Sequence, residues 1–561
     1  MRRFVLFVAV LSLVACSREE RPAKPGPAAP VVADDTPQDG GTLIRRLEVD
    51  VASLNPIVST SRYDRYVANY LFTPLVYFDK ELRPVPGLAK SWEVSADGRV
   101  YTFALNEKAT FADGTPVRAS DVVFTLNKIV DPASEAVQIA GYFELLDKAN
   151  TKAIDDHTVQ IAFREAFASQ MIRFNDVLVL PEHIYGKAAN FKADFATKAV
   201  GSGPYRLVRR VPGTEIVVER RADFWGTRPH IQTVVFRVIG DAQTAWKALQ
   251  RGDIDETIIV SDTWQREHRN PELQKSIDFR RFYTLNYNYV AWNTRDPLLS
   301  DKRIRRALTM CIPIESVISD LYHGTARAMS GPFTPDEWAY NPAVPVIRHD
   351  PEGAKRILVS LGWLDQNGDG ILEKQGKPLK VEMIIIPGSA TTSQFAQMFQ
   401  AELKKIGVQL ELVTLDGSIA IQRILGGNYQ STYLGWDLDP DPDQFGIFHS
   451  SQIPPRGQNF TFYSNPEADR LIEAGRKELD QSRRREIYHR LHAVLAEDQP
   501  YTWTTQVSVK WALSKRLRGV DVSRGYGLYL WYPGELGWWI PKQYQRKTAP
   551  APAPAAAPAT K

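Results

Sequence analysis

Pro86-Gly-Leu-Ala-Lys-Ser-Trp-Glu-Val-Ser-Ala-Asp-Gly98 opens a stretch that continues as Tyr101-Thr-Phe-Ala-Leu105 and Phe111-Ala-Asp-Gly-Thr-Pro-Val-Arg-Ala-Ser-Asp-Val-Val-Phe124. Its first two runs are rich in aromatic and β-branched residues and flank Asp97-Gly98, which is typical of a β-hairpin turn. A second Asp-Gly pair at 113–114 repeats the pattern. Residues 119–121 then cap a helix whose apolar positions recur from Val122 to Ile129. The stretch predicts an α/β fold.

Length and composition set the first limits on the architecture and the function. The chain has 561 residues, which is too many for one small domain and predicts two or three lobes. With 43% hydrophobic residues, 24% charged residues and a net charge of +4, it lacks the basic balance of a nucleic-acid-binding protein. The 13 Trp and 22 Tyr residues supply flat, amphipathic surface, which favours a recognition cleft.

The two ends of the chain differ in composition from its body. Residues 1–15 combine a basic start with a short apolar run, and Leu-Val-Ala-Cys at 13–16 resembles a bacterial lipobox. We therefore expect residues 1–16 to be a lipoprotein signal peptide, with Cys16 lipidated and the mature protein tethered on the periplasmic side of the cell envelope. An ordinary signal peptide with a chance cysteine is the alternative. The Pro/Ala-rich segments 17–40 and 546–561 predict a disordered linker and a disordered tail.

Two later segments suggest longer elements. The apolar and aromatic pattern of 279–292 predicts one long strand that crosses between lobes. Residues 466–497 carry a helical pattern, which we expect to break near Asp480.

A second stretch, 434–445, reads Leu-Gly-Trp-Asp-Leu-Asp-Pro-Asp-Pro-Asp-Gln-Phe and suggests a binding site. Its carboxylates belong to Asp437, Asp439, Asp441 and Asp443. Because proline fixes φ and donates no hydrogen bond, the two prolines predict a rigid loop that leaves a strand at 432–434. Trp436 beside the carboxylates favours a binding site for a ligand with an amine, a cation or a metal over a solvent-exposed acidic loop without a binding role.

These motifs resemble the extracellular solute-binding proteins of family 5, the oligopeptide- and dipeptide-binding receptors of ABC importers. Further matching blocks are Gly201–Tyr205, Arg221–Trp225, Trp292–Thr294, Asp301–Leu308 and Tyr463–Pro466. The resemblance covers residues 41–540 and implies a periplasmic-binding-protein-like α/β fold, in which two main lobes close on a cleft and a third lobe is inserted. Lobe I would contain 41–78, 199–290 and 505–545, lobe II 79–198, and lobe III 291–504.

The resemblance also implies a ligand site. Trp436 would form an apolar wall, and Asp437, Asp439 and Asp441 would meet a cationic end or backbone N–H groups of the solute. In peptide-binding members the aspartate three residues after the tryptophan anchors the peptide amine, and Asp439 holds that place. Because the segment here is one residue shorter, Asp437 and Asp439 are both candidates. The residues expected on the facing wall are Ser59, Thr60, Ser61, Tyr287 and Trp292.

The expected function is that of a substrate-binding lipoprotein, acting as a monomer, that captures peptides or peptide-like solutes and delivers them to a membrane permease. We find no G-x-S-x-G, H-E-x-x-H, P-loop or Rossmann motif, so we expect no enzyme. One alternative is an envelope hydrolase that acts on a cell-wall fragment through Asp437 and Asp441. Another is a sensor lipoprotein that kept the binding fold.

A metal site is one of two readings of a loop in the second half of the chain. Its oxygen-bearing positions alternate as in the first half of a calcium loop: Asp365, Asn367, Asp369, Ile371 through its carbonyl, and Glu373. The bidentate glutamate of such loops is missing, since Gly376 stands at the twelfth position. The other reading is a plain turn stabilised by Asp and Asn side chains. We expect no required cofactor, and any calcium here would be structural.

Overall fold

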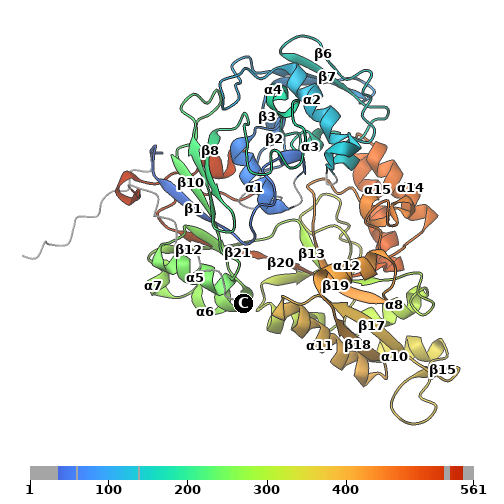
Figure 1. Ribbon diagram of the computed structural model, residues 1–561. Helices are drawn as coiled ribbons and strands as arrows, with labels where there is room; N and C mark the ends of the chain where they lie inside the picture. The colour runs from blue at the N-terminus through green and yellow to red at the C-terminus, as the bar shows by residue number, and fades with distance from the viewer. Residues whose placement is uncertain (1–35, 59–60, 137–138, 524–530, 547–561) are drawn as a thin grey trace, which may run out of the picture. The chain divides into compact units, whose positions relative to one another are not determined.

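The computed structural model describes residues 36–58, 61–136, 139–523 and 531–546 (Figure 1). The expected signal peptide with Cys16, the linker up to residue 35, the wall residues Ser59 and Thr60, and the tail from 547 lie outside these ranges. Within the described ranges, no helix is long and apolar enough to span a bilayer.

The first sheet has seven strands in the order β12-β21-β11-β1-β10-β9-β8. Its strands are β1 (Thr42–Leu47), β8 (Tyr205–Val211), β9 (Glu215–Arg220), β10 (Thr233–Val238), β11 (Glu256–Ile258), β12 (Ile277–Phe282) and β21 (Val509–Ser514). The helices of the same chain segments are α1 (Arg62–Leu71), α5 (Ala242–Arg251), α6 (Ser261–Glu267) and α7 (Pro271–Gln274). Strands from the two ends of the chain therefore share one sheet.

A separate four-stranded sheet, in the order β4-β5-β7-β6, contains the hairpin of the 86–105 motif. Its strands are β4 (Ala89–Val94), β5 (Val100–Leu105), β6 (Lys152–Ala153) and β7 (Thr158–Ala162), and β2 (Val76–Phe78) pairs with β3 (Pro84–Pro86) nearby in sequence. The helices here are α2 (Ala119–Ile129), α3 (Gln170–Arg173) and α4 (Glu182–Tyr185). The predicted hairpin and the helix up to Ile129 are confirmed, and Gly98 turns the hairpin with a φ of 69°. Residues 119–121, expected to cap the helix, form its first turn instead, and the N-cap residue is Arg118, whose N–H donates to the Asp121 carboxylate.

The third large sheet has six strands in the order β14-β20-β13-β19-β17-β18. They are β13 (Asn286–Trp292), β14 (Ala326–Ala328), β17 (Lys380–Ile385), β18 (Gln409–Thr414), β19 (Ser431–Asp437) and β20 (Tyr501–Val507), and β15 (Glu373–Lys374) pairs with β16 (Lys377–Pro378) separately. Side chains of β13 alternate between two hydrophobic clusters, with Val290 and Trp292 in one and Tyr287, Tyr289 and Ala291 in the other. The central strand is therefore buried on both faces.

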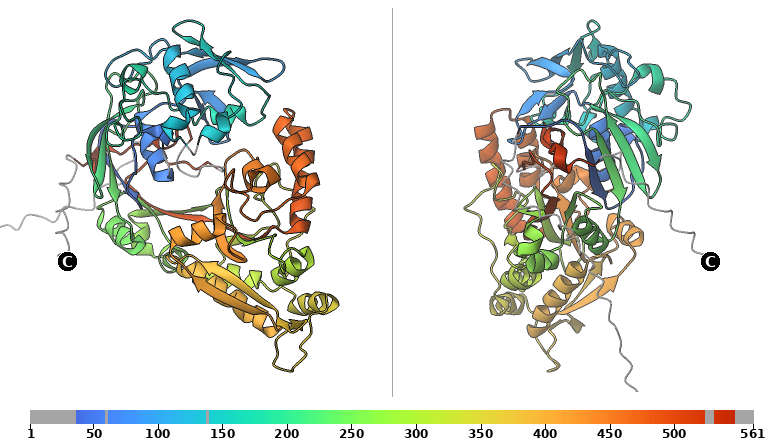
Figure 2. Two further views of the ribbon diagram at one scale, coloured as in Figure 1. Left: turned by 45° about the vertical axis from the view of Figure 1, so that its right-hand side comes forward. Right: turned by 90° about the vertical axis from the view of Figure 1, so that its left-hand side faces the viewer.

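The helices of this second half follow the sequence pattern. They are α8 (Lys302–Thr309), α9 (Ile314–Ser316), α10 (Pro351–Ser360), α11 (Ala390–Lys405), α12 (Gly417–Leu425), α13 (Phe445–Phe448), α14 (Pro466–Lys477) and α15 (Gln481–Asp498). Helices α14 and α15 lie side by side (Figures 1 and 2). The expected break near Asp480 is confirmed, because the Asp480 carboxylate accepts the backbone N–H of Arg483 at 2.9 Å and caps α15.

The prediction of one long strand over 279–292 is wrong, because the chain forms two strands that belong to different sheets. β12 pairs with β21 in the seven-stranded sheet, and β13 pairs with β20 in the six-stranded sheet. At the start of β13, the Asn286 side-chain amide donates to the carbonyl and the hydroxyl of Thr284 and to the carbonyl of Val507. The chain passes between these two sheets a second time at Ser508, between β20 and β21. The division into three lobes with the boundaries given above stays a prediction.

Candidate functional site

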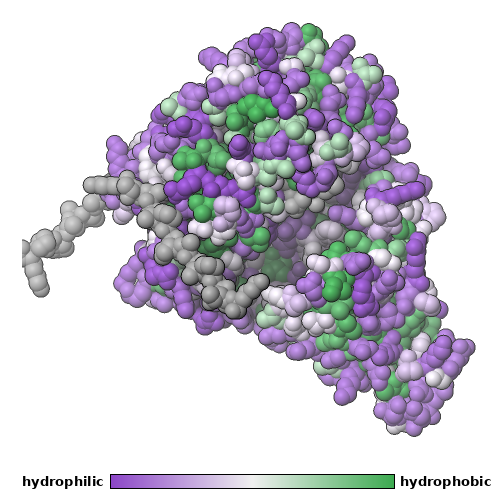
Figure 3. Space-filling model, in the orientation of Figure 1, coloured by the Kyte–Doolittle hydropathy of each residue, from purple (hydrophilic) through white to green (hydrophobic). Residues whose placement is uncertain are grey.

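A cavity of about 900 Å³ is lined by segments that lie far apart in the sequence. Its lining comes from positions within 78–84, 168–172, 336–338 and 479–484, together with Leu285, Pro440, Asp441 and Val522. Its volume falls in the range of small-molecule sites, about 300–1,000 Å³. The face of the molecule seen in Figure 1 is also hollowed at its centre, with hydrophobic residues at the bottom of the hollow (Figure 3).

The loop within the acidic segment 434–445 begins later than the sequence predicted. Strand β19 runs to Asp437, so Trp436 and Asp437 belong to the strand and the loop starts at Leu438. The physical reason is continued pairing with β13, in the register Tyr287↔Trp436 and Asn286↔Asp437. The prolines interrupt the backbone only from Pro440 onward, where the loop also reaches the cavity.

Each aspartate of the acidic segment is paired with an arginine of the same chain. The pairs are Asp437 with Arg62 at 3.3 Å, Asp439 with Arg173 at 3.0 Å, Asp441 with Arg484 at 2.7 Å, and Asp443 with Arg476 at 3.3 Å. The arginines come from α1, α3, α15 and α14. The three carboxylates expected to meet the solute are therefore already compensated by charges of the protein.

These ion pairs differ in burial and therefore in strength. The side chains of Asp437 and Arg62 are 73% and 47% exposed, whereas those of Asp441 and Arg484 are 10% and 7% exposed. Arg484 donates from both terminal nitrogens to the two oxygens of Asp441, each at 2.7 Å. Such a bidentate, desolvated pair is the strong form of this interaction, while an exposed pair contributes little.

Asp439 lies in a pair of intermediate exposure with an additional partner. The Tyr142 hydroxyl donates to its carboxylate at 3.1 Å, and the Arg173 guanidinium carbon lies 3.5 Å from the centre of the Tyr142 ring. Burial alone would lower the pKa of Arg173, but Asp439 and Tyr142 raise it overall, so this guanidinium stays charged. Asp439 thus joins the acidic loop to residues 142 and 173.

Trp436 is half-buried within an aromatic cluster. Its indole N–H donates to the Tyr501 hydroxyl at 3.3 Å, and its ring is parallel to that of Tyr289 at a centroid distance of 6.3 Å. Phe460 contacts it from another direction at 6.3 Å. These contacts fix the orientation of the indole, which keeps part of its surface accessible.

The described residues of the expected facing wall, Ser61, Tyr287 and Trp292, are placed differently from the expectation. Tyr287 and Trp292 are both 0% exposed, and the Trp292 indole N–H donates to the Thr502 hydroxyl at 2.8 Å. Neither side chain presents surface to a solute in this structure, because both pack into the clusters on the two faces of β13. Ser61 caps α1: its hydroxyl accepts from the N–H of Asp64 at 3.2 Å, and its own N–H donates to the Asp64 carboxylate.

Of the described site residues predicted from the sequence, only Asp441 lines the cavity. Glu337 and Trp338 are among the lining residues that the sequence did not reveal. They lie in a turn that begins at Thr334, whose backbone N–H donates to the Glu337 carboxylate. Burial raises the pKa of Glu337 to about 7. The Trp338 ring packs against Tyr488 at 5.7 Å, with the Arg484 guanidinium carbon 5.5 Å from its centre. The available signal was the sequence Thr-Pro-Asp-Glu-Trp at 334–338, in which carboxylates adjoin a tryptophan after a proline.

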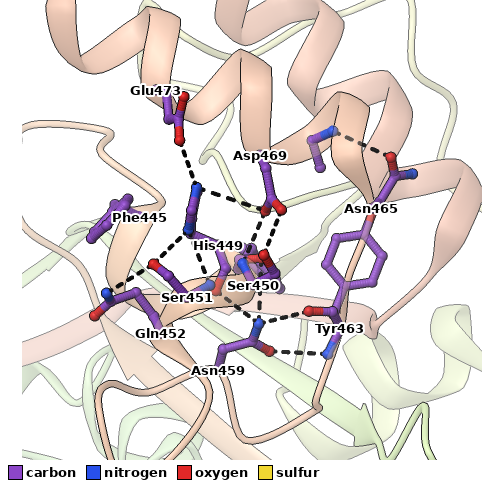
Figure 4. A network of polar contacts seen from close by, with 12 residues as sticks. Phe445, His449, Ser450, Ser451, Gln452, Asn459, Tyr463, Asn465, Asp469 and Glu473 are labelled. Carbon is purple, nitrogen blue, oxygen red and sulfur yellow. Dashed lines mark hydrogen bonds and ion pairs between the residues drawn. The ribbon is translucent and has the colours of Figure 1, made fainter.

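A polar network holds the segment that follows the acidic loop (Figure 4). The Nδ1 atom of His449 lies 2.7 Å from the Ser451 hydroxyl oxygen, and its Nε2 lies 3.2 Å from a carboxylate oxygen of Glu473 in α14. The Ser450 hydroxyl donates to Asp469 at 2.6 Å, and the Asn459 amide donates to the carbonyls of residues 448, 449 and 463. The network fixes the loop end against α14.

The calcium-like loop has its side-chain oxygens engaged by its own backbone. Asp365 accepts the N–H groups of Gly368 at 2.8 Å and Gly370 at 3.0 Å, and Asp369 accepts that of Ile371 at 2.8 Å. Asn367 donates to Glu373 at 2.8 Å. Over the described part of the chain, no group of three His, Cys, Asp or Glu side chains is arranged to hold a metal ion. This geometry matches the turn reading of the sequence.

The two readings of this loop make opposite predictions for Asp365→Ala. Because the carboxylate of Asp365 accepts two backbone N–H groups, we expect the variant to lower the melting temperature by the same amount in calcium and in chelator. Differential scanning fluorimetry in both buffers measures this. A loss confined to the calcium buffer would instead establish a structural calcium site.

Comparison with known proteins places this architecture in a family. Residues 83–452 match the family described as "Bacterial extracellular solute-binding proteins, family 5 Middle". The chain is 28% identical over 547 residues to the oligopeptide-binding protein AppA of Bacillus subtilis (strain 168). This alignment covers 96% of this chain and 98% of the relative. It is 27% identical over 458 residues to the dipeptide-binding protein of Escherichia coli (strain K12), and that alignment covers 78% of this chain and 84% of the relative.

Solved structures are similar over nearly the whole chain. The structure of B. subtilis AppA in complex with a nonapeptide has a TM-score of 0.76 at 27% identity and covers 90% of this chain and 100% of that one. The structure of NikZ from Campylobacter jejuni in complex with Ni(L-His) has a TM-score of 0.77 at 25% identity and covers 89% and 99%. These similarities confirm the expected periplasmic-binding-protein-like α/β fold. Since the family match extends over more than half of the sequence, the chain belongs to the bacterial extracellular solute-binding proteins of family 5.

Proposed function

We propose that the chain captures a peptide or a peptide-like solute in the cavity next to the acidic loop and delivers it to the permease of an ABC importer. The observation that carries the proposal is the composition of the cavity wall. Apolar side chains such as Phe78, Met171 and Leu285 line it together with Glu337 and Trp338. This mixture suits a solute with an apolar body and a few polar groups. The names of the relatives, which bind oligopeptides and dipeptides, support the same class of solute.

The cavity also suits a closing mechanism. Its lining includes residues 78–84 and 168–172 as well as residues 336–338 and 479–484. The chain passes between the two large sheets twice, from β12 to β13 and from β20 to β21. Bending at 283–285 and at Ser508 would move these segments relative to each other, as in hinged binding proteins. The Asp439–Arg173 pair, which joins the acidic loop to α3, would then stabilise the closed state.

Thermal stabilisation by the solute tests this function. We expect the melting temperature of the purified chain to rise with at least one member of a panel of di- to nonapeptides, amino acids and nickel–histidine complexes. A solute at 100 times its Kd adds about 2.7 kcal/mol to the free energy of unfolding. If only the nickel–histidine complexes stabilise the chain, peptides are not its solutes. If nothing in the panel stabilises it, the proposed capture of peptide-like solutes fails.

The proposed receptor is a monomer tethered to a membrane through a lipid on Cys16. The support is the sequence Leu-Val-Ala-Cys at 13–16 after a short apolar run. We expect Cys16→Ser to leave an uncleaved precursor or to release the protein from the detergent phase, because the thiol is the acylation site. Detergent partitioning and gel migration measure this. Unchanged partitioning and migration would leave an ordinary signal peptide as the correct reading.

A further inference from the structure

The carboxylates that line the cavity differ in whether the protein neutralises them. Asp441 receives two hydrogen bonds from Arg484, and Glu81 pairs with Arg83 at 3.2 Å. Asp336 pairs with Arg327. Glu337 forms no ion pair with any Lys, Arg or His within the described residues, although it belongs to the same cavity wall.

The environment of Glu337 makes an unpaired carboxylate costly. Its side chain is half-buried and held in the turn by the backbone N–H of Thr334. Burial raises its pKa to about 7, with Asp441 and Asp336 contributing through like-charge repulsion. A carboxylate that is partly desolvated without a cationic partner is stabilised by a cation that enters the cavity.

The neighbours of Glu337 indicate what kind of cation the cavity accepts. Trp338 and Arg484 line the same cavity, with the Arg484 guanidinium over the Trp338 ring. Arg484 is held in place by Asp441 and by the Tyr488 hydroxyl at 3.1 Å. The lining also contains Lys80, which pairs with Asp521 at 2.7 Å, and apolar side chains such as Phe78, Met171 and Leu285. An organic cation with an apolar body fits this arrangement, since a bare metal ion would need several oxygen or nitrogen ligands at one point.

We infer that Glu337 is the carboxylate with which the cavity recognises a primary ammonium group of its solute. The inference rests on the proposed capture of peptides or peptide-like solutes and replaces the aspartates of the acidic loop, each of which is paired with an arginine, as the ammonium acceptor. In a peptide the ammonium group belongs to the N-terminus or to a lysine side chain.

The test compares three peptide libraries with the full chain and its Glu337→Gln variant by titration calorimetry. The first library contains di- to pentapeptides without Lys, Arg or His, the second contains the same peptides N-acetylated, and the third contains N-acetylated peptides with one lysine. Glu81→Gln is the matched control, because Glu81 lines the same cavity but is exposed and paired with Arg83. Glu337→Asp keeps the charge and serves as the conservative variant.

We expect the wild-type chain to bind the free-amine library at least about 30-fold more tightly than the acetylated one, since a desolvated charge pair has about this effect. Glu337→Gln should lose this preference and bind the acetylated library as the wild type does. Glu81→Gln should keep the preference, and Glu337→Asp should keep part of it. Tight binding of the lysine library would assign the ammonium group to a side chain.

Two results would overturn the inference while leaving the proposed function intact. One is a wild-type chain that binds the free and acetylated libraries equally well. The other is a Glu337→Gln variant that retains the wild-type preference. If the wild-type chain binds none of the three libraries, the proposed capture of peptides fails, and the role of Glu337 fails with it.

Discussion

The variant Arg484→Met is expected to lower the free energy of unfolding by about 3–5 kcal/mol, which is the typical effect of removing one partner of a buried ion pair. The guanidinium is 7% exposed and donates twice to Asp441, and its Nε donates to the carbonyl of Gly475 at 2.7 Å. Methionine fills similar space but leaves the Asp441 carboxylate, itself 10% exposed, without its counter-charge. Chemical denaturation followed by tryptophan fluorescence measures the loss.

The matched control is Arg62→Met, which removes the partner of Asp437 at the other end of the same segment. Because these side chains are 47% and 73% exposed, we expect a loss well under about 1 kcal/mol. The double variant Arg484→Met/Asp441→Leu should recover part of the stability, since no buried charge is then left unpaired. Equal losses for Arg484→Met and Arg62→Met would contradict the difference in burial between the two pairs.

Trp292→Ala is expected to lower the free energy of unfolding by about 3–5 kcal/mol, because truncating a fully buried tryptophan leaves a large cavity. Trp292 is 0% exposed, and its indole N–H bonds to the Thr502 hydroxyl on β20. The milder Trp292→Phe variant should lose less stability and should bind the free-amine peptide library with unchanged Kd. Chemical denaturation and titration calorimetry on the same samples separate the two effects.

This pair of measurements also decides between two roles for Trp292. A core residue changes stability without changing the affinity of the folded protein. If Trp292→Phe lost solute affinity at full folding, the side chain would contact the solute, as the resemblance to family members implied and the buried position does not.

Local sequence signals predicted local structure well. The Asp-Gly turn at 97–98 and the helix up to Ile129 both follow from residues that are close in sequence, and both are confirmed. The strand over 279–292 was harder, because its apolar pattern continues through a point where the ladder changes partners. Pairing with β21 on one side and β20 on the other depends on residues more than 200 positions away, which no local pattern reports.

In the candidate site, too, local features were predictable from the sequence and long-range contacts were not. The acidic segment and Trp436 are visible in the sequence, but the arginines that neutralise Asp437 and Asp439 lie 375 and 266 residues away. Charge compensation between distant segments is a property of the folded chain, so a free carboxylate cannot be told from a paired one by composition. Glu337 shows the converse, because an ordinary glutamate becomes a candidate only when the fold places it in a cavity wall whose cations, Lys80 and Arg484, pair with other carboxylates.

Hydrogen–deuterium exchange of the full chain, with and without the free-amine peptide library, tests most directly whether a solute binds in this cavity. The account predicts slower exchange in segments from both sides of the cavity, 78–84 and 168–172 on one side and 336–338 and 479–484 on the other. It also predicts slower exchange near the crossing points at 283–285 and 508, where closure would restrict motion. If the library raises the melting temperature and the cavity segments exchange as fast as before, the solute binds elsewhere and this account of the site is wrong.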